Sequence, residues 1–260
     1  MTRFILVLLL ILPQGTVTTG PTKTAGPTVI QTGIGGGGAI TWTLTQHSAA
    51  IVHCSTVSSC AGTLPGNDTA GDLVVVMGAW FVNGGAAPVF SSISGSETMT
   101  HCPSQAGSVN PSGSILLDTD CAYILSAAGG FSSFTFNLTA TTNDIDIYVL
   151  EFARSSGTAS IDTCGAGGAI ACVATSTSCT TCTGATPTIT GNADVVMTWA
   201  AFGQVPTGVA SPYNTSPSPV LDTTNVEGGF GWSLSQTSAN AASWSQTPTG
   251  AASLSTIAFK

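Results

Sequence analysis

The sequence predicts an all-β chain that folds as an antiparallel two-sheet β-sandwich of the jelly-roll type and is stabilised by disulfides. Over Phe131–Arg154, apolar and polar residues alternate with a period of two, which is typical of pleated strands with one face in a core. Elsewhere, short apolar runs are separated by turns rich in Gly, Ser and Asn, and no long stretch has the spacing of an amphipathic helix. The chain also contains 8 cysteines.

The N-terminal residues predict a secretory signal and a linker. A basic residue precedes the uninterrupted apolar run Phe4–Leu12, and this run is shorter than the ~20 residues that a bilayer span needs. We therefore expect residues 1–18 to be a signal peptide, with cleavage within residues 15–26. Residues 19–38 are rich in Gly, Thr and Pro and predict a leader or linker. A single β-sandwich domain is expected over residues 39–260.

The composition restricts the partners of the chain. Charged residues make up 6% of it, and 12 acidic residues against 4 basic ones give a net charge of −8. A nucleic-acid backbone requires a cluster of cations to replace its counterions, and the basic residues are instead scattered along the chain. The sequence therefore excludes nucleic acid and an anionic membrane surface as partners, and it holds no membrane span beyond the signal. Hydrophobic residues at 43% suffice for a core.

The cysteines predict disulfides, because the chain is expected to be secreted. Their order favours local bridges, Cys54 with Cys60 and Cys102 with Cys121. The CxxC near residue 180 leaves a zinc site as the alternative, but zinc sites use two tight pairs or added histidines, and all the histidines lie far away in sequence. The last four cysteines are expected to pair among themselves: Cys164, Cys172, Cys179 and Cys182.

The first half of the domain predicts a series of strands. Ala39–Gln46 alternates and predicts the first strand, whereas His53–Ala70 contains a cysteine pair and turn residues and predicts a loop. Asp72–Val82 is a continuous, valine-rich apolar run, which predicts a buried central strand. Val89–Thr100 predicts two strands around a turn, and Cys121–Ala127 predicts another short strand.

The second half begins at the alternating segment Phe131–Arg154, which predicts a β-hairpin that turns at Thr141–Asn143. Ser155–Ala185 predicts a cysteine-rich loop. Asp194–Phe202 predicts a second buried strand and echoes the run that begins at Asp72. We interpret this echo as two central strands in similar environments, with an internal repeat as the alternative. A Pro-rich loop then leads to three closing strands, over Phe230–Gln236, Ala242–Gln246 and Ser253–Phe259.

Several short core motifs carry a resemblance to a known family. They are Asp72-Leu-Val-Val, Phe134-Thr-Phe136, Ile147-Tyr-Val-Leu-Glu-Phe152, Asp194-Val-Val, and Trp244 followed by Ile257-Ala-Phe-Lys260. In this order, over residues 39–260, the chain resembles an uncharacterised family of secreted concanavalin-like jelly-roll modules of environmental bacteria. It departs from the family in its cysteine-rich insert and after Phe152, where the family turns with Ser-Gly. The resemblance implies the fold and an extracellular location, and it brings no established activity.

Three carboxylates are the candidates for catalysis if the chain is an enzyme: Asp144, Asp146 and Glu151. Glycoside hydrolases need two carboxyl groups that flank the scissile bond, and Asp144 and Asp146 share a strand face. Glu151 lies on the opposite face by parity unless a bulge intervenes. The alternative for the two aspartates is a solvent-facing strand end or a Ca²⁺ site. Since Glu151 stands in an apolar strand, we expect an ion pair with Arg154 or hydrogen bonds from backbone amides.

Aromatic residues are the candidates for sugar binding, because exposed rings stack on pyranose faces. Trp232, Trp244 and Tyr213 are the ligand-binding candidates, with Trp42 as a further one. Trp80 and Trp199 belong to the two buried runs and are expected in the core. No Gly-x-Ser-x-Gly elbow, P-loop or dinucleotide fingerprint is present.

These observations favour a secreted, acidic, non-catalytic β-sandwich that acts as a surface, matrix or carbohydrate-interacting module. It is expected to need no cofactor, with Ca²⁺ as the alternative, and its partners would be glycans or other copies of itself. One alternative is a structural subunit of an extracellular filament, because weakly charged edge strands permit strand-to-strand association. The other is a glycoside hydrolase on the same scaffold. The ligand, the oligomeric state and the cleavage site stay open.

Overall fold

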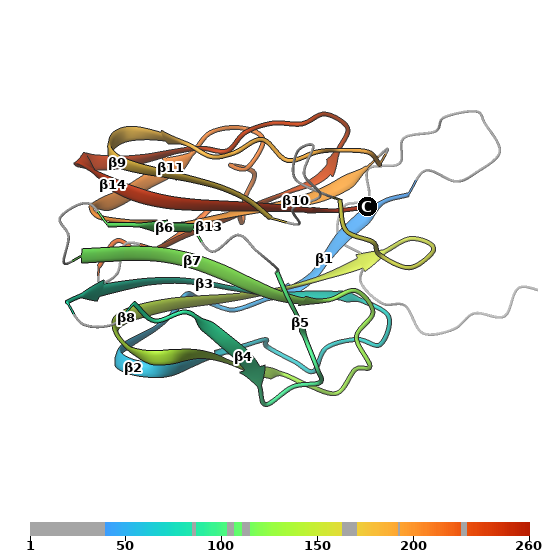
Figure 1. Cartoon of the computed structure of the whole chain (residues 1–260). Coiled ribbons are helices and arrows are strands. Elements are labelled where there is room, and N and C mark those ends of the chain that lie inside the picture. Colours follow the sequence, from blue (N-terminus) through green and yellow to red (C-terminus); the bar gives the residue numbers. More distant parts are fainter. Residues whose placement is uncertain are drawn as a thin grey trace, which may run out of the picture. The chain divides into compact units, whose positions relative to one another are not determined.

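The strands of the chain form two antiparallel sheets that pack face to face (Figure 1). Among the described residues, all regular structure is β-strand, so the predicted all-β, two-sheet sandwich is confirmed. None of these residues belongs to a helix long and apolar enough to cross a membrane. The computed structural model describes residues 40–84, 87–102, 107–110, 115–162, 171–191, 193–224 and 228–260.

The N-terminal half of the chain builds the first sheet. Its order is β1-β8-β3-β7-β5, with β2 and β4 paired to β8 and β6 paired to β7. The apolar strand β3 lies at its centre, between β8 and β7, as expected for a strand that is covered on both faces. The strands are β1 (Trp42–His47), β2 (Val52–Thr63), β3 (Leu73–Asn83), β4 (Phe90–Ser94), β5 (Thr100–His101), β6 (Gly107–Val109), β7 (Ile115–Ile124) and β8 (Ser133–Arg154).

The C-terminal half builds the second sheet. Its order is β11-β14-β10-β13-β12, and β9 pairs with β14. Every residue of β10 is buried, which confirms the prediction of a second central strand. The strands are β9 (Ala171–Thr183), β10 (Asp194–Phe202), β11 (Val205–Val209), β12 (Val220–Leu221), β13 (Gly228–Gln236) and β14 (Ser243–Phe259).

Strand β8 differs from the predicted hairpin. It continues without a turn through Thr141–Asn143, and β2 follows it around the bend with a register shift between Val57 and Ser59. Figure 1 shows the two strands curling over together. The two arms of β8 then face each other: a Cβ atom at Gly78 of β3, which lies beside the second arm, would come within 2.7 Å of the Phe136 ring of the first arm. The predicted turn is therefore wrong, although the two opposed arms exist.

The loops predicted over His53–Ala70 and Ser155–Ala185 are also wrong in part. They contain β2 and β9, two strands rich in Ser, Thr and Cys. Each pairs with the long bent strand of its sheet, β8 or β14, and is held by backbone hydrogen bonds rather than by apolar side chains. Period-two hydrophobicity is therefore weak in them, which is why the sequence pattern misses these strands.

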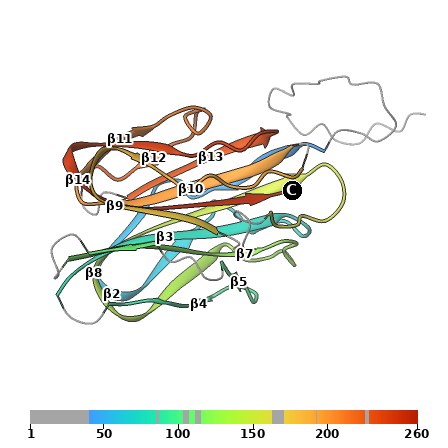
Figure 2. The same ribbon diagram turned by 45° about the horizontal axis from the view of Figure 1, so that its top comes forward.

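Because both sheets fold over, the described residues form three cores. One lies between the sheets and includes Met77 and Trp199. A second lies inside the folded first sheet and includes Trp80, and a third lies inside the folded second sheet and includes Trp244. Figure 2 shows the layered strands of the two halves, with β11 and β14 at the upper side of the view and β2 and β4 at the lower side. The prediction that Trp80 and Trp199 lie in the core is confirmed.

The two halves have equivalent topologies. β3 lies between β7 and β8, as β10 lies between β13 and β14. Phe152 pairs with Leu73 in the first sheet, and Phe259 pairs with Val195 in the second. The equivalence continues along both central strands, where alternate residues enter the core between the sheets: Leu73, Val75, Met77 and Ala79 in β3, and Val195, Met197, Trp199 and Ala201 in β10. The echo in the sequence is therefore part of an internal structural repeat.

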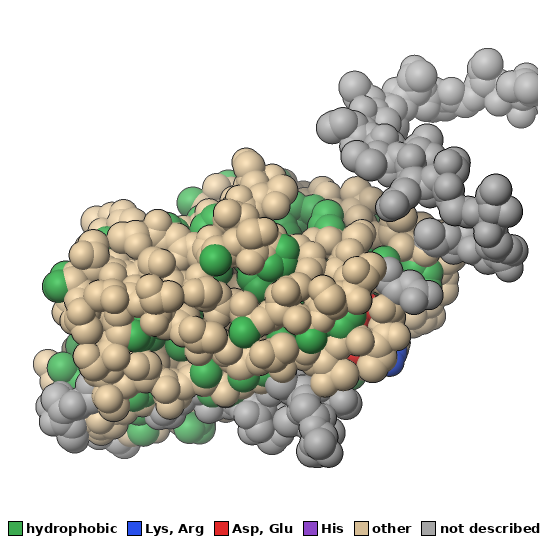
Figure 3. All heavy atoms as spheres, turned by 90° about the horizontal axis from the view of Figure 1, so that it is seen from above, with side chains coloured by type: hydrophobic (Ala, Val, Ile, Leu, Met, Phe, Trp, Pro, Cys, Tyr) green, Lys and Arg blue, Asp and Glu red, His purple; other side chains and the backbone are tan. Residues whose placement is uncertain are grey.

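Disulfides fasten the strands. Cys54 bonds to Cys60 within β2, where β2 and β8 bend, and Cys102 bonds to Cys121 of β7, as predicted. The CxxC cysteines of β9 bond to each other, so they are not zinc ligands. Cys164 lies outside the described residues. Seen from above, the surface consists mostly of backbone and of side chains that are neither charged nor apolar, with apolar side chains scattered between them (Figure 3).

Candidate functional site

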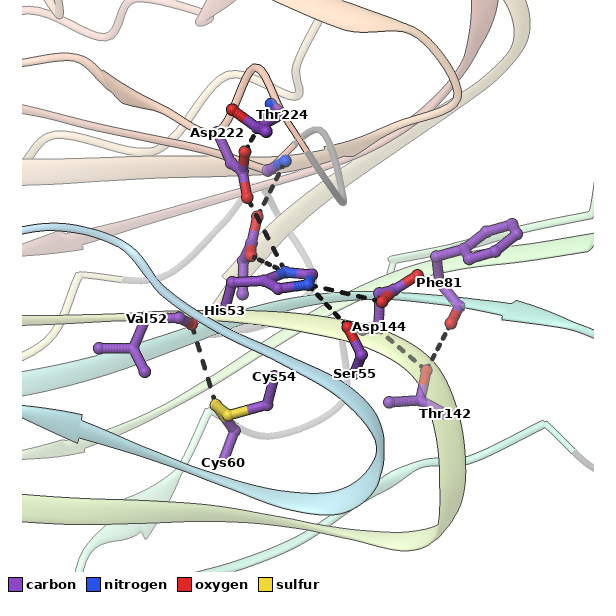
Figure 4. Close-up of polar contacts among 12 residues, drawn as sticks. Val52, His53, Cys54, Ser55, Cys60, Phe81, Thr142, Asp144, Asp222 and Thr224 are labelled. Carbon is purple, nitrogen blue, oxygen red and sulfur yellow. Dashed lines mark hydrogen bonds and ion pairs between the residues drawn. A yellow bond between two sulfur atoms is a disulfide. The ribbon is translucent and has the colours of Figure 1, made fainter.

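Polar side chains from both halves of the chain meet at one end of the core between the sheets (Figure 4). His53 comes from β2, Asp144 and Asp146 come from β8, and Asp222 directly follows β12. Asp146 lies on the face of β8 that points toward the second sheet, because it continues the alternation of the core residue Tyr148. The pairing of His53 with Asp146 across β2 and β8 places the imidazole beside that carboxylate.

The imidazole of His53 is surrounded by carboxylates. Its Nδ1 lies 3.2 Å from Asp146 Oδ1 and 3.8 Å from Asp222 Oδ2. Its Nε2 lies 3.6 Å from Asp144 Oδ1 and 2.8 Å from the hydroxyl of Ser55. The inner group of His53, Asp146 and Asp222 thus presents one nitrogen and two oxygen atoms toward a common point.

Backbone amides hold the outer oxygens of the two inner carboxylates. The Gly228 amide donates to Asp146 Oδ2 at 3.1 Å, and the Thr224 amide donates to Asp222 Oδ1 at 2.7 Å. A Cβ atom at Gly228 would lie 2.3 Å from Asp146 Oδ2, so the close approach of β13 to this carboxylate requires glycine.

Burial sets the electrostatics of the site. Asp146 is 0% exposed and Asp222 is 9% exposed. The pKa of Asp146 is raised to about 8, first by burial and then by the negative charges of Asp222 and Asp144. A hydrogen bond with Asp222 raises the pKa of Asp146 further. The protonated form of Asp146 is therefore favoured here, and a nearby positive charge would favour its ionised form.

The structure brings Asp144 and Asp146 together but separates them from Glu151. Glu151 points to the opposite face of β8, as the parity argument predicted, and it accepts hydrogen bonds from the Thr69 amide at 2.8 Å and the Gln46 side chain at 2.5 Å. Burial raises the pKa of Glu151. Hydrogen bonding to a backbone amide is thus confirmed for Glu151, and no ion pair with Arg154 occurs among the described residues: Arg154 lies over the Trp42 ring, 5.9 Å from its centroid.

The aromatic residues proposed for sugar binding are buried. Trp244 lies in the core of the second half and donates to Thr198 Oγ1 at 3.1 Å, and Tyr213 donates to the Asn240 carbonyl at 2.8 Å. Trp42 is also buried. Trp42 lies in the core between the sheets, and Trp244 and Tyr213 lie inside the folded second sheet. The expectation of exposed ring faces is therefore wrong for all three. Trp232 is buried as well, but it lines a cavity of about 220 Å³.

Two further polar groups were not singled out from the sequence. His101 bonds to Asp120 at 2.7 Å and stacks on Phe90, with 4.4 Å between the ring centroids. At the other end of the core, Lys260 pairs with Asp162 at 2.7 Å. Asp194 is buried nearby, and the pKa of its carboxyl group is raised to about 7 by burial and by Asp162.

The partners of these groups come from distant parts of the chain, which is why no local motif marks them. The same holds for His53 and Asp222, whose contact depends on the packing of the two sheets. The one available signal was the Asp-Ile-Asp motif of β8, which marked two of the four residues of the site. No protein-family model, curated protein or solved structure matches this chain.

Proposed function

We propose that this chain is a secreted, non-catalytic β-sandwich module that serves as a structural element of an extracellular surface or matrix. The N-terminal apolar run supports export, and the disulfides are compatible with an oxidising compartment. The resemblance to secreted jelly-roll modules agrees with this location.

The burial of the acidic side chains carries the proposal. A glycoside hydrolase needs two carboxyl groups, about 5–10 Å apart, that reach a sugar from either side. Asp146 and Glu151 are both fully buried, point to opposite faces of β8, and are held by internal hydrogen bonds. The Asp144 side chain is 26% exposed, but the side chain of its neighbour Asp146 is not exposed. The three candidates therefore do not supply two carboxyl groups that a polysaccharide can reach.

Outer strands with exposed hydroxyl groups support a role in assembly. β9 pairs with β14 alone among the described strands, and its exposed residues are Thr175, Thr177, Ser178, Thr180, Thr181 and Thr183. It carries no charged residue. Charged residues on edge strands normally prevent pairing with a second chain, and β9 has none, which supports its edge as the place of strand-to-strand association.

The test uses the natively secreted protein. Light scattering after size exclusion, with negative-stain microscopy, should reveal oligomers or ordered particles, and a polysaccharide hydrolysis screen should remain negative. Thr180→Lys in β9 should weaken the association, while Ser92→Lys on the exposed face of β4 should not. Hydrolysis that is lost in Asp146→Asn or Glu151→Gln would refute the non-catalytic proposal, and a monomer at all concentrations would remove the assembly role.

Glycan binding is the second candidate function, and the cavity beside Trp232 supports it. Leu44, Pro217 and Leu234 contribute to its lining, and Leu234 is 37% exposed. Binding on a glycan array should be lost in Leu234→Lys and retained in Val89→Lys, which changes the other large apolar side chain that is exposed among the described residues, at 49% exposure. Equal binding by both variants would eliminate this cavity as the glycan site.

A further inference from the structure

We propose that His53, Asp146 and Asp222 form a binding site for a single divalent transition-metal ion, with Zn²⁺ as the best fit, which links the two halves of the chain. This site goes beyond the structural role proposed above and does not depend on it. Three strands or strand ends that are distant in sequence supply the ligands, so the ion would act as a cross-link between the first and second sheets.

The distances between the ligand atoms fit one ion. The ligand atoms of the three side chains all lie within 4.8 Å of one another, and Nδ1 of His53 is 3.2 Å from Asp146 Oδ1 and 3.8 Å from Asp222 Oδ2. Zinc bonds to nitrogen and oxygen are about 2.0–2.2 Å long, so ligands around one tetrahedral ion lie roughly 3–4 Å apart. Small side-chain movements suffice to complete this geometry.

The surrounding hydrogen bonds orient the ligands. When Nδ1 of His53 binds a metal, the proton of the ring lies on Nε2, where Ser55 Oγ at 2.8 Å and the Asp144 carboxylate can accept it. The amides of Gly228 and Thr224 bind the outer oxygens of Asp146 and Asp222. A ligating histidine whose other nitrogen faces a carboxylate, and ligating carboxylates that are themselves hydrogen-bonded, are the usual outer shell of a metal site.

The ligand set selects the kind of metal. Imidazole is a ligand of zinc and neighbouring transition metals, and carboxylates complete such sites. Ca²⁺ takes 6–8 oxygen ligands and seldom uses nitrogen, so the Ca²⁺ alternative considered for Asp144 and Asp146 does not fit a centre that includes His53. Asp144 faces the opposite nitrogen of His53 and acts as an outer partner rather than as a ligand.

The equivalent place in the other half provides an independent comparison. Asp146 lies opposite Ala79, as Ser253 lies opposite Ala201. His53 pairs with Asp146, as Thr175 pairs with Ser253.

The contact across the two sheets is equivalent as well. Gly228 pairs with Ala201 and Thr119 pairs with Ala79. Where Asp146 meets the Gly228 amide, the other half brings Thr119 Oγ1 to 3.4 Å from Ser253 Oγ. Neutral hydroxyls thus fill the equivalent position of the same architecture. The packing of the sheets therefore does not require an acid at this position. The presence of Asp146, Asp222 and His53 at the first contact needs a separate explanation, and a bound cation supplies one.

The test measures metal binding by the full secreted chain. After removal of metal with EDTA, calorimetric titration with ZnCl₂ should show one equivalent of tight binding, and titration with CaCl₂ at the same concentrations should show none. Asp222→Asn and His53→Gln should each weaken zinc binding by about 100-fold, because a neutral amide replaces one of the three ligands and even the loss of an outer partner of a ligand costs about 10–100-fold. His101→Gln is the matched control, because it removes the other His–Asp pair of the first half, and it should bind zinc like the unmodified chain.

Near-ultraviolet circular dichroism establishes that each variant is folded before titration. The proposal would be overturned if the unmodified chain bound no zinc. It would also be overturned if the single variants His53→Gln and Asp222→Asn both bound zinc as tightly as the unmodified chain. Equal loss in His101→Gln would place the metal elsewhere and would also overturn it. As a second readout, Co²⁺ should give a visible absorption spectrum that is absent in His53→Gln.

Discussion

The two halves of this chain share one architecture and differ in the chemistry of one contact. In the first half, the bent strand β8 brings one residue into contact with β13 of the second sheet. In the second half, the bent strand β14 brings one residue into contact with β7 of the first sheet. In one copy, the buried carboxylate of Asp146 accepts a hydrogen bond from the Gly228 amide and lies beside His53. In the other copy, the hydroxyls of Ser253 and Thr119 face each other. The difference teaches that the fold needs only a small polar contact at this place, so the charged copy is a specialisation of one half.

A second pair of equivalent positions shows the opposite behaviour. Asp72 and Asp194 both precede the apolar core of the central strand in their half. Asp194 lies beside Asp162, and although burial opposes it, hydrogen bonds from Asp194 and Lys260 leave the pKa of Asp162 lowered to about 2. Asp72 accepts a hydrogen bond from Thr45 at 2.9 Å and is a neighbour of buried Glu151. Both copies therefore retain an acid with an acidic neighbour, as expected of a feature that belongs to the repeat itself.

The largest effects on stability are expected in the core inside the folded first sheet and in the core inside the folded second sheet. Substitutions there test whether the two halves fold as one unit. Trp80→Ala and Phe202→Ala empty equivalent positions of the cores inside the first and second halves. Each should lower the free energy of unfolding by about 3–5 kcal/mol. Because the halves share the core between the sheets, denaturant titrations should show one transition for both variants. Two separate transitions would mean that the repeats unfold independently.

A pH-dependent effect is expected at Asp118 of β7, which is buried away from the contact between the halves. Burial raises the pKa of Asp118 to about 8, so its ionisation opposes folding, and this cost appears as the pH rises from about 4 toward 8. Asp118→Asn should leave stability unchanged at pH 4 and increase the free energy of unfolding by a few kcal/mol, to order of magnitude, at pH 8.

Urea titrations of both proteins across this range measure the effect. Glu97→Gln is the control, because it replaces an acid of the same half that lies outside the buried cores. A difference between Asp118→Asn and the unmodified chain that does not change with pH would contradict the assignment of a protonated carboxyl to this position.

A smaller effect is expected from exchanging the chemistry of the two contacts. Gly228→Ala places a Cβ atom against Asp146 and should cost about 1–3 kcal/mol. In an Asp146→Ser background, which reproduces the residue of the other half, the same substitution should cost about 1 kcal/mol less, because the carboxylate oxygen is gone. Equal costs in both backgrounds would show that Gly228 is needed for a reason other than this carboxylate.

The sequence predicted the fold class because long alternating and apolar runs mark the inner strands. It also predicted the two local disulfides, the core positions of Trp80 and Trp199, and the opposite orientation of Glu151. It missed β2 and β9 because these outer strands are held by backbone hydrogen bonds and bury few apolar residues. It missed the bend in β8 because a continuous strand and a tight hairpin share the same alternation.

The candidate site was only half visible in the sequence. The Asp-Ile-Asp motif marked Asp144 and Asp146, but His53 and Asp222 join them through sheet pairing and through the packing of one half on the other. Local patterns carry no information on such contacts. The expectation of exposed rings failed for Trp244 and Tyr213 for a related reason, since an aromatic residue in an apolar segment looks the same whether or not a second layer covers it.

The most direct test of the account is the anomalous scattering of crystals grown from the zinc-loaded protein, measured at wavelengths on both sides of the zinc absorption edge. We expect one strong peak between His53 Nδ1, Asp146 Oδ1 and Asp222 Oδ2, and no peak at the equivalent contact of Thr119 with Ser253. A map without a peak at the first place, or with the zinc bound elsewhere on the chain, would contradict the claim that one half of this repeat has become a metal site.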